Sequence, residues 1–411
     1  MTYGIQENAG ETALVTGATG FVGLEVVHTL LARYGDLRVV ALLRAADDIT
    51  LAQRHRRLVE TLPAALRERL TVVRGDVAAP RLGLDDATHR ALVASVDRVL
   101  HCAASTRFDL DLATARRENV EGTRSVLALC REIRQRGGRG RLDHVSTAFV
   151  AGRRVGAVGE EELCDRAGFR NTYERTKFEA ESLCRAARDE IPVVILRPSI
   201  VVGRRSSGAT TSYKAAYGPM RMLINLYDLW PALLTRVLPL PLRPDVLVDL
   251  VPVDWVAQAI GALWRSDAAV GRCYHLAAGP DAAASVRTLA DLTCDVFDVP
   301  HLRFVSPGAL SHAIGRAGYP VLRAVAPKVA ALVGITFSYG LSMPTFDTTN
   351  TRAAGIDPPA VAEYYARIVD FAARGHFGRT RKPPTVATGW ATVTPPGAPS
   401  ATPRHPSSPH R

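Results

Sequence analysis

The architecture follows from one stretch, Thr12-Ala-Leu-Val-Thr-Gly17-Ala-Thr-Gly20-Phe-Val-Gly23-Leu-Glu-Val-Val-His-Thr-Leu-Leu31. Its first five residues predict a buried strand, and residues 24–31 predict a helix. The glycines between them permit a tight turn, and they let the pyrophosphate of a dinucleotide approach the helix N-terminus. The sequence therefore predicts a dinucleotide site with GxxGxxG spacing. We expect this turn to contact the dinucleotide through Gly17, Thr19, Gly20, Phe21, Val22 and Gly23.

Apolar segments with strand character recur along the first half of the chain and alternate with helical segments. Besides the first, the predicted strands are 37–43, 71–77, 98–103, 142–147 and 193–198. This alternation is typical of βαβ crossovers. It predicts an α/β fold with a doubly wound parallel Rossmann sheet, helices on both faces, and a smaller, mostly helical C-terminal substrate lobe. The expected boundaries are 1–204 for the NADP-binding Rossmann domain with 251–278 returning to it, 205–250 and 279–378 for the substrate-binding lobe, and 379–411 for a disordered basic tail rich in Pro, Ser and Thr.

Arg44 stands at the end of the second predicted strand. An acid at this point binds the ribose 2′-hydroxyl of NAD, whereas an arginine accommodates the 2′-phosphate of NADP. The sequence therefore predicts NADPH, although Asp47 and Asp48 follow closely enough to keep NAD open. Further cofactor contacts are expected where later strands end, at Asp76, Val77, Ala103, Ala104, Ser105, Pro198 and Ile200.

Residues 171–184 predict a helix that carries Tyr173 and Lys177 four positions apart, and hence on one face. A nearby ammonium lowers the pKa of a phenol and makes it usable as a general acid or base. A Tyr and a Lys at this spacing are common on surface helices, so the residues around them carry the argument. Asn119 precedes the pair, and Ser146 and Thr147 place two hydroxyls at the end of the fifth predicted strand.

With these motifs in this order, the sequence is similar to the extended short-chain dehydrogenase/reductases, and within them to the fatty acyl-CoA reductases and thioester reductases. The similarity covers roughly residues 10–280 and rests on the segments 16–23, 75–84, 101–108, 119–123, 144–150, 171–177, 196–201 and 250–254, with 346–350 beyond that range.

The resemblance implies a role for each residue of the predicted site. Thr147, with Ser146 as the alternative, would hydrogen-bond the substrate carbonyl oxygen. Tyr173 would protonate the developing oxyanion, and Lys177 would hold the nicotinamide ribose and lower the pKa of Tyr173. Asn119 would order a water in a proton relay. The implied reaction reduces an acyl thioester, borne by coenzyme A or an acyl carrier protein, to an aldehyde, and the sequence leaves a second reduction to the alcohol open.

Two alternatives remain. The first is another extended family member acting on a ketone or alcohol such as a hydroxysteroid, or a nucleotide-sugar epimerase or dehydratase. Arg44 speaks against an epimerase, which usually holds NAD. The second is a regulatory or scaffold protein that has lost catalysis, and the intact Thr147, Tyr173 and Lys177 set speaks against it.

The chain has 411 residues, 47% of them hydrophobic, and a formal net charge of +11. Its positive charge suits phosphate-bearing ligands, and no nucleic-acid-binding motif is present. Six cysteines without paired spacing predict neither a metal site nor disulfides and favour a cytoplasmic location. No transmembrane helix is predicted, peripheral membrane contact stays open, and the oligomeric state is not indicated.

Several further segments have competing interpretations. The apolar segments 220–242 and 322–335 suit an acyl channel, a lipid-facing surface or ordinary packing. The arginine-rich segment 51–70 predicts a solvated helix, and His101, His144 and Cys102 are expected to be packed rather than catalytic.

Overall fold

The computed structural model describes residues 10–221, 224, 242–304 and 342–378. Its centre is a seven-stranded parallel sheet in the order β11-β7-β5-β4-β1-β2-β3. The strands are β1 (Thr12–Thr16), β2 (Arg38–Leu43), β3 (Leu70–Arg74), β4 (Arg98–His101), β5 (Arg141–Val145), β7 (Val193–Pro198) and β11 (Cys273–Leu276). The predicted Rossmann-like α/β architecture is confirmed.

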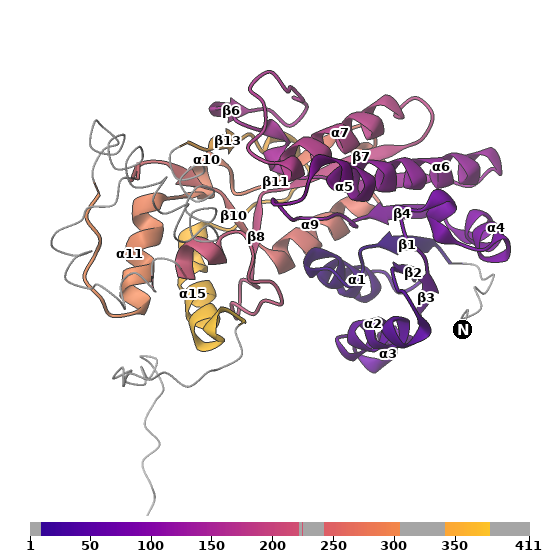
Figure 1. Cartoon of the computed structure of the whole chain (residues 1–411), viewed down its shortest axis with the longest axis horizontal. Coiled ribbons are helices and arrows are strands. Elements are labelled where there is room, and N and C mark those ends of the chain that lie inside the picture. Colours follow the sequence, from indigo (N-terminus) through magenta and orange to yellow (C-terminus); the bar gives the residue numbers. More distant parts are fainter. Residues whose placement is uncertain (1–9, 222–223, 225–241, 305–341, 379–411) are drawn as a thin grey trace, which may run out of the picture. The chain divides into compact units, whose positions relative to one another are not determined.

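Helices cover both faces of this sheet (Figure 1). One face carries α1 (Phe21–Arg33) and α9 (Val253–Trp264), and the other carries α4 (Asp86–Ser95), α6 (Gly122–Gln135) and α7 (Thr172–Ala186). Alternate residues of β1 enter the two cores: Val15 packs in the cluster that contains Val27, and Leu14 packs in the cluster that contains Val126. The strands are buried on both faces for this reason, as parallel sheets require.

A third apolar cluster lies away from the sheet, where α11 (Val286–Val296) and α15 (Tyr365–Arg374) pack beside Tyr217 (Figure 1). The remaining helices are α2 (Asp48–Glu60), α3 (Ala64–Arg67), α5 (Leu112–Arg116), α10 (Gly279–Ala282) and α14 (Thr349–Ala353). Three two-stranded pairs join β6 (Gly156–Val158) to β13 (Pro344–Phe346), β8 (Ile200–Val202) to β10 (Leu250–Pro252), and β9 (Leu247–Val248) to β12 (Ala284–Ser285).

The division into a Rossmann domain and a substrate lobe stays a prediction. The predicted tail 379–411, the apolar segment 322–335 and most of 220–242 lie outside the described residues. Within the described ranges, no helix combines the length and apolarity needed to cross a bilayer.

Several predicted element bounds differ from the structure. The third strand ends at Arg74 because its partner β2 ends at Leu43, opposite it in the ladder. The fifth ends at Val145, so Ser146 and Thr147 follow the strand rather than belong to it. The predicted helix 51–70 is two helices, since Pro63 caps the N-terminus of α3. The seventh strand, β11, was not predicted.

Candidate active site

The glycine turn packs directly against the end of β4. Gly17 has φ +72°, and a Cβ there would lie 2.6 Å from the backbone nitrogen of Ala103. A Cβ at Gly23 would lie 2.1 Å from the Gly17 carbonyl oxygen. Gly20 is the N-cap of α1 and offers no side chain to its first N–H groups. The turn therefore presents unpaired backbone donors at a helix N-terminus, the arrangement that binds a pyrophosphate.

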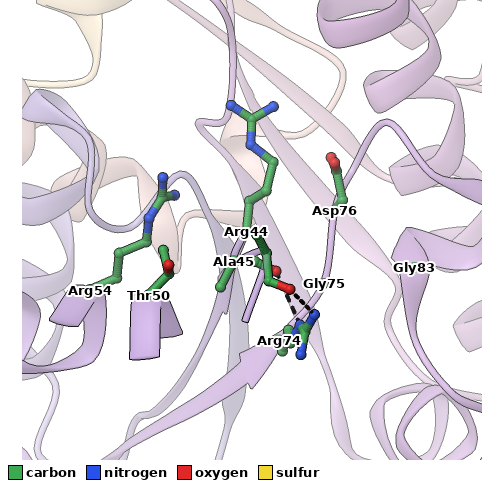
Figure 2. A pocket seen from close by; sticks show the side chains of 9 residues that line it. Arg44, Ala45, Thr50, Arg54, Arg74, Gly75, Asp76 and Gly83 are labelled. Atoms are coloured by element: carbon green, nitrogen blue, oxygen red, sulfur yellow. Dashed lines mark hydrogen bonds between the residues drawn. The ribbon is translucent and has the colours of Figure 1, made fainter. Parts of the chain in front are cut away.

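A pocket of about 540 Å³ lies beyond the C-terminal ends of β2 and β3 (Figure 2). Figure 2 shows Arg44, from the end of β2, and Arg54, from α2, pointing to the same side as Asp76. The pocket is lined by Arg44, Ala45, Ala46, Thr50, Arg54, Arg74, Gly75, Asp76 and Gly83. Two arginines beside the end of β2 give this pocket the charge that a ribose 2′-phosphate requires.

Both carboxylates that left NAD open have other partners. Asp47 caps α2 by accepting from the Thr50 amide at 2.7 Å. Asp48 pairs with Arg74 at 3.6 Å, and Arg74 also donates to the carbonyls of Ala45 and Ala46 at 3.1 and 2.6 Å. Arg74 thus braces the loop after β2.

Arg54 belongs to the segment predicted to be a solvated helix, and it is partly exposed in the structure, but a role at the pocket was not predicted. It lines the pocket, and among the described residues it has no ion-pair partner. The sequence signal that could have found Arg54 is its short separation from Arg44 along the chain. Because α2 begins four residues after Arg44, its second turn lies near the end of β2.

Tyr173 and Lys177 project from the first turns of α7, whose N-cap Asn171 accepts from the Glu174 amide at 2.9 Å. Thr147, just beyond β5, lies close enough to the Tyr173 phenol to lower its pKa. The Lys177 ammonium donates to the carbonyl of Val145 at 2.8 Å. The end of β5 and the start of α7 therefore bring a hydroxyl, a phenol and an ammonium to one place.

Burial decides the proton state of this site. It raises the pKa of Tyr173 to about 12, against the lowering effect of the Thr147 side chain. It also lowers the pKa of Lys177 to about 8. The expectation of a lowered Tyr173 pKa is wrong for the structure described, because desolvation of the phenolate outweighs the lowering effect of Thr147. Tyr173 is therefore protonated at neutral pH, in the form that donates a proton.

The two hydroxyls after β5 point to different partners. Thr147 donates weakly to the Pro198 carbonyl at 3.4 Å in addition to contacting Tyr173. Ser146 donates to the Glu181 carboxylate at 2.7 Å. The geometry distinguishes the pair: Thr147 faces the phenol, and Ser146 faces a buried ion pair.

That ion pair joins Glu181 on α7 to Arg197 on β7, both with no exposed side-chain surface. The contact is bidentate, at 2.7 and 2.9 Å. Arg197 also contacts the His275 ring at 3.1 Å, and that ring contacts the Asp347 carbonyl at 2.7 Å. Sequence analysis missed this network, whose only signal was that Tyr173, Lys177 and Glu181 recur every four residues on one helix face.

Asn119 lies in a π-helical turn, Arg117–Glu121, between α5 and α6. Its amide nitrogen donates to Thr176 at 2.9 Å and to the Ser105 carbonyl at 3.2 Å, and its oxygen accepts from the Ser105 amide at 2.7 Å. Asn119 thus ties the loop after β4 to α7. The water-ordering role stays a prediction.

The other predicted cofactor residues sit at or just after strand ends along the same edge. Ala103, Ala104 and Ser105 follow β4, Pro198 ends β7, and Ile200 begins β8. Val77 packs against Gly122 at the start of α6. His101 and Cys102 were expected to be packed rather than catalytic. The His101 ring hydrogen-bonds the hydroxyls of Thr16 and Thr123, and burial raises the pKa of the Cys102 thiol to about 11.

The family model described as Male sterility protein, an NAD-binding family, matches residues 15–260. The chain belongs to the male sterility protein family. This match includes the glycine turn, the pocket, and Thr147, Tyr173 and Lys177.

Relatives of this chain include long synthases and shorter reductases. It is 32% identical over 260 residues to the isonitrile lipopeptide synthase of Streptomyces coeruleorubidus, covering 61% of this chain and 16% of that protein. It is 28% identical over 245 residues to the fatty acyl-CoA reductase wat of Drosophila melanogaster, covering 52% of this chain and 47% of that protein. The chain thus spans less than half the length of each.

Among solved structures, the terminal R domain of the myxalamid PKS-NRPS biosynthetic pathway is similar, with a TM-score of 0.73 and 26% identity. The match covers 90% of this chain and 92% of that chain. The predicted membership of the extended short-chain dehydrogenase/reductases, in the branch of fatty acyl-CoA reductases and thioester reductases, is confirmed. The chain thus belongs to a family of nicotinamide-dependent oxidoreductases.

Proposed function

We propose that this chain reduces an acyl thioester, carried by coenzyme A or an acyl carrier protein, with NADPH as the reductant. The observation that carries the proposal is the meeting of Thr147, Tyr173 and Lys177 at the strand edge that also holds the glycine turn. The similarity to a fatty acyl-CoA reductase and to an R domain supports a thioester as the substrate class.

The residues present fit NADPH. The glycine turn and the uncapped N-terminus of α1 suit the pyrophosphate, and Arg44 and Arg54 suit the 2′-phosphate. Lys177 lies near the nicotinamide ribose in this proposal. When bound, NADPH supplies the hydride, so the chain's own residues provide position and electrostatics.

Each side chain has one task in the proposed reaction. Thr147 donates a hydrogen bond to the thioester carbonyl oxygen and orients it toward Tyr173. Tyr173 gives its proton to that oxygen as negative charge develops, which produces a hemithioacetal. This species collapses as its C–S bond breaks and its hydroxyl proton passes to the leaving sulfur, so an aldehyde and a free thiol result. Reduction of the aldehyde to the alcohol in the same site is the open second half of the proposal.

A substrate panel tests this function. Purified protein is mixed with NADPH and acyl-CoAs of increasing chain length, and NADPH oxidation and released thiol are measured together. We expect one free thiol to be released for each thioester that is reduced to the aldehyde. NADPH oxidation with free ketones, steroids or nucleotide sugars, and none with any acyl-CoA or acyl carrier protein, would favour the alternative family activities.

A cytoplasmic location is also part of the proposal and rests on six cysteines that are all free thiols.

Cofactor preference gives the first expected outcome. Replacing Arg44 or Arg54 by Ala removes a charge-assisted contact to the 2′-phosphate, so the Kd for NADPH should rise about tenfold. The Kd for NADH should change less than about twofold, since NADH has no phosphate there. Fluorescence titration measures both. Arg57→Ala, on the exposed side of the same helix, is the control and should change neither value, and equal weakening of both cofactors would rule out the phosphate role.

The pH profile gives a second expected outcome. Burial lowers the pKa of Lys177 to about 8, so its ammonium is present below that pH and is lost above it. We expect kcat/KM to be level near pH 7 and to fall about tenfold per pH unit above about 8. Lys177→Arg keeps a charge at every pH measured and should remove this decline while lowering the plateau. A wild-type profile that stays level to pH 10 would contradict this role of Lys177.

A further inference from the structure

Arg44 has an acidic partner from a different strand connection. One oxygen of the Glu118 carboxylate lies 3.6 Å from an Arg44 nitrogen. Arg44 follows β2, whereas Glu118 belongs to the π-helical turn after α5, one residue before Asn119. The arginine expected to bind the 2′-phosphate is therefore shared with a carboxylate.

Protein stability does not account for this pair. The Arg44 side chain is 58% exposed and the Glu118 side chain is 26% exposed, and their 3.6 Å contact is too long for a hydrogen bond. Exposed pairs of this kind contribute little to the free energy of folding. Its main consequence is local, because a negative charge sits next to the place where a phosphate is expected.

We propose that Glu118 is a specificity-determining residue that weakens binding of the NADPH 2′-phosphate to Arg44. The inference rests on the proposed use of NADPH. The 2′-phosphate carries nearly two negative charges. If it and the Glu118 carboxylate lie on opposite sides of the Arg44 guanidinium, they are roughly 7 Å apart. In a water-like medium their repulsion corresponds to about five- to tenfold in affinity.

The neighbouring charges leave Arg44 as the relevant partner. Arg107 also feels the Glu118 charge, but its pKa is raised mainly by Asp109, with which it forms a bidentate pair at 2.9 and 3.1 Å. Glu121, one turn along, pairs with Arg124 at 3.1 Å instead. Removing the Glu118 charge therefore changes the field at Arg44 while Arg107 and Arg124 keep their own carboxylate partners.

The test is fluorescence titration of NADPH and NADH with wild type, Glu118→Gln and the matched control Glu121→Gln. We expect Glu118→Gln to bind NADPH about five- to tenfold more tightly at low salt, with the NADH Kd within about twofold of wild type. In 1 M salt the gain should shrink, since charges several ångströms apart are then screened. Glu121→Gln should leave both Kd values unchanged, and adding Arg44→Ala to Glu118→Gln should return the NADPH Kd to about the wild-type value, since the lost phosphate contact costs about tenfold.

Three results would overturn the inference. An unchanged or weakened NADPH Kd in Glu118→Gln would mean that the carboxylate does not compete, and an equal gain for both cofactors would mean that it acts on the whole crevice. A wild type that binds NADH as tightly as NADPH would remove the proposed cofactor and this inference together. If wild type prefers NADPH and Arg44→Ala loses this preference, but Glu118→Gln leaves the NADPH Kd unchanged, only the inference fails and the proposed cofactor stands.

Discussion

Tyr173→Phe is expected to lower the single-turnover rate of thioester reduction by about 10²- to 10⁴-fold, the range that a positioned general acid supplies. The substitution removes only the hydroxyl that Thr147 contacts and leaves the ring of Tyr173 against Phe108, 5.8 Å between centroids. The Kd for NADPH should therefore stay within about twofold of wild type. Stopped-flow absorbance of NADPH gives the rate, and fluorescence titration gives the Kd.

Tyr34→Phe is the matched control. Its hydroxyl donates to the Gly261 carbonyl at 2.7 Å, between the C-terminal end of α1 and α9, whereas Thr147 follows the C-terminal end of β5. It should leave the rate within about twofold of wild type. A Tyr173→Phe protein that keeps half of the wild-type rate would show that another group delivers the proton.

Arg197→Met is expected to lower the free energy of unfolding by about 3–5 kcal/mol, because it leaves the Glu181 carboxylate buried without its main counter-charge. Neither side chain of this pair has exposed surface. Typical domains have about 5–15 kcal/mol of total stability, so the loss is a large share of it. Urea unfolding followed by fluorescence measures the change.

Two further variants sharpen this prediction. Arg185→Met removes a contact to the same carboxylate at 2.9 Å from a side chain that is 18% exposed, and it should cost only about 1–2 kcal/mol. Combining Glu181→Met with Arg197→Met removes both buried charges and should recover part of the loss. A double variant that is destabilised by the sum of the two single effects would contradict the ion-pair explanation.

The parts of the site that were predictable are encoded locally. The glycines at 17, 20 and 23 fix a strand-turn-helix whose ligand is set by backbone geometry, and the four-residue spacing of Tyr173 and Lys177 fixes their common face. Both are properties of contiguous segments, so periodicity and spacing reveal them.

The parts that were missed depend on contacts between distant segments. Glu181 meets Arg197 only because α7 packs on β7, and Glu118 meets Arg44 only because two strand connections face each other. The Tyr173 pKa was misjudged for the same reason. Spacing places Lys177 nearby, but the degree of burial, which raises that pKa to about 12, emerges only from the packed structure.

In the proposed reaction, hydride passes from NADPH to the carbonyl carbon of a thioester at this site. The most direct measurement uses NADPH deuterated at the transferable position of nicotinamide C4, an acyl-CoA, and mass spectrometry of the products from wild type and Tyr173→Phe. We predict that wild type gives an aldehyde or alcohol with deuterium on the former carbonyl carbon, together with an equal amount of free coenzyme A for each first reduction, and that Tyr173→Phe gives almost none. Free coenzyme A with the carboxylic acid, or a product without deuterium, would contradict the account.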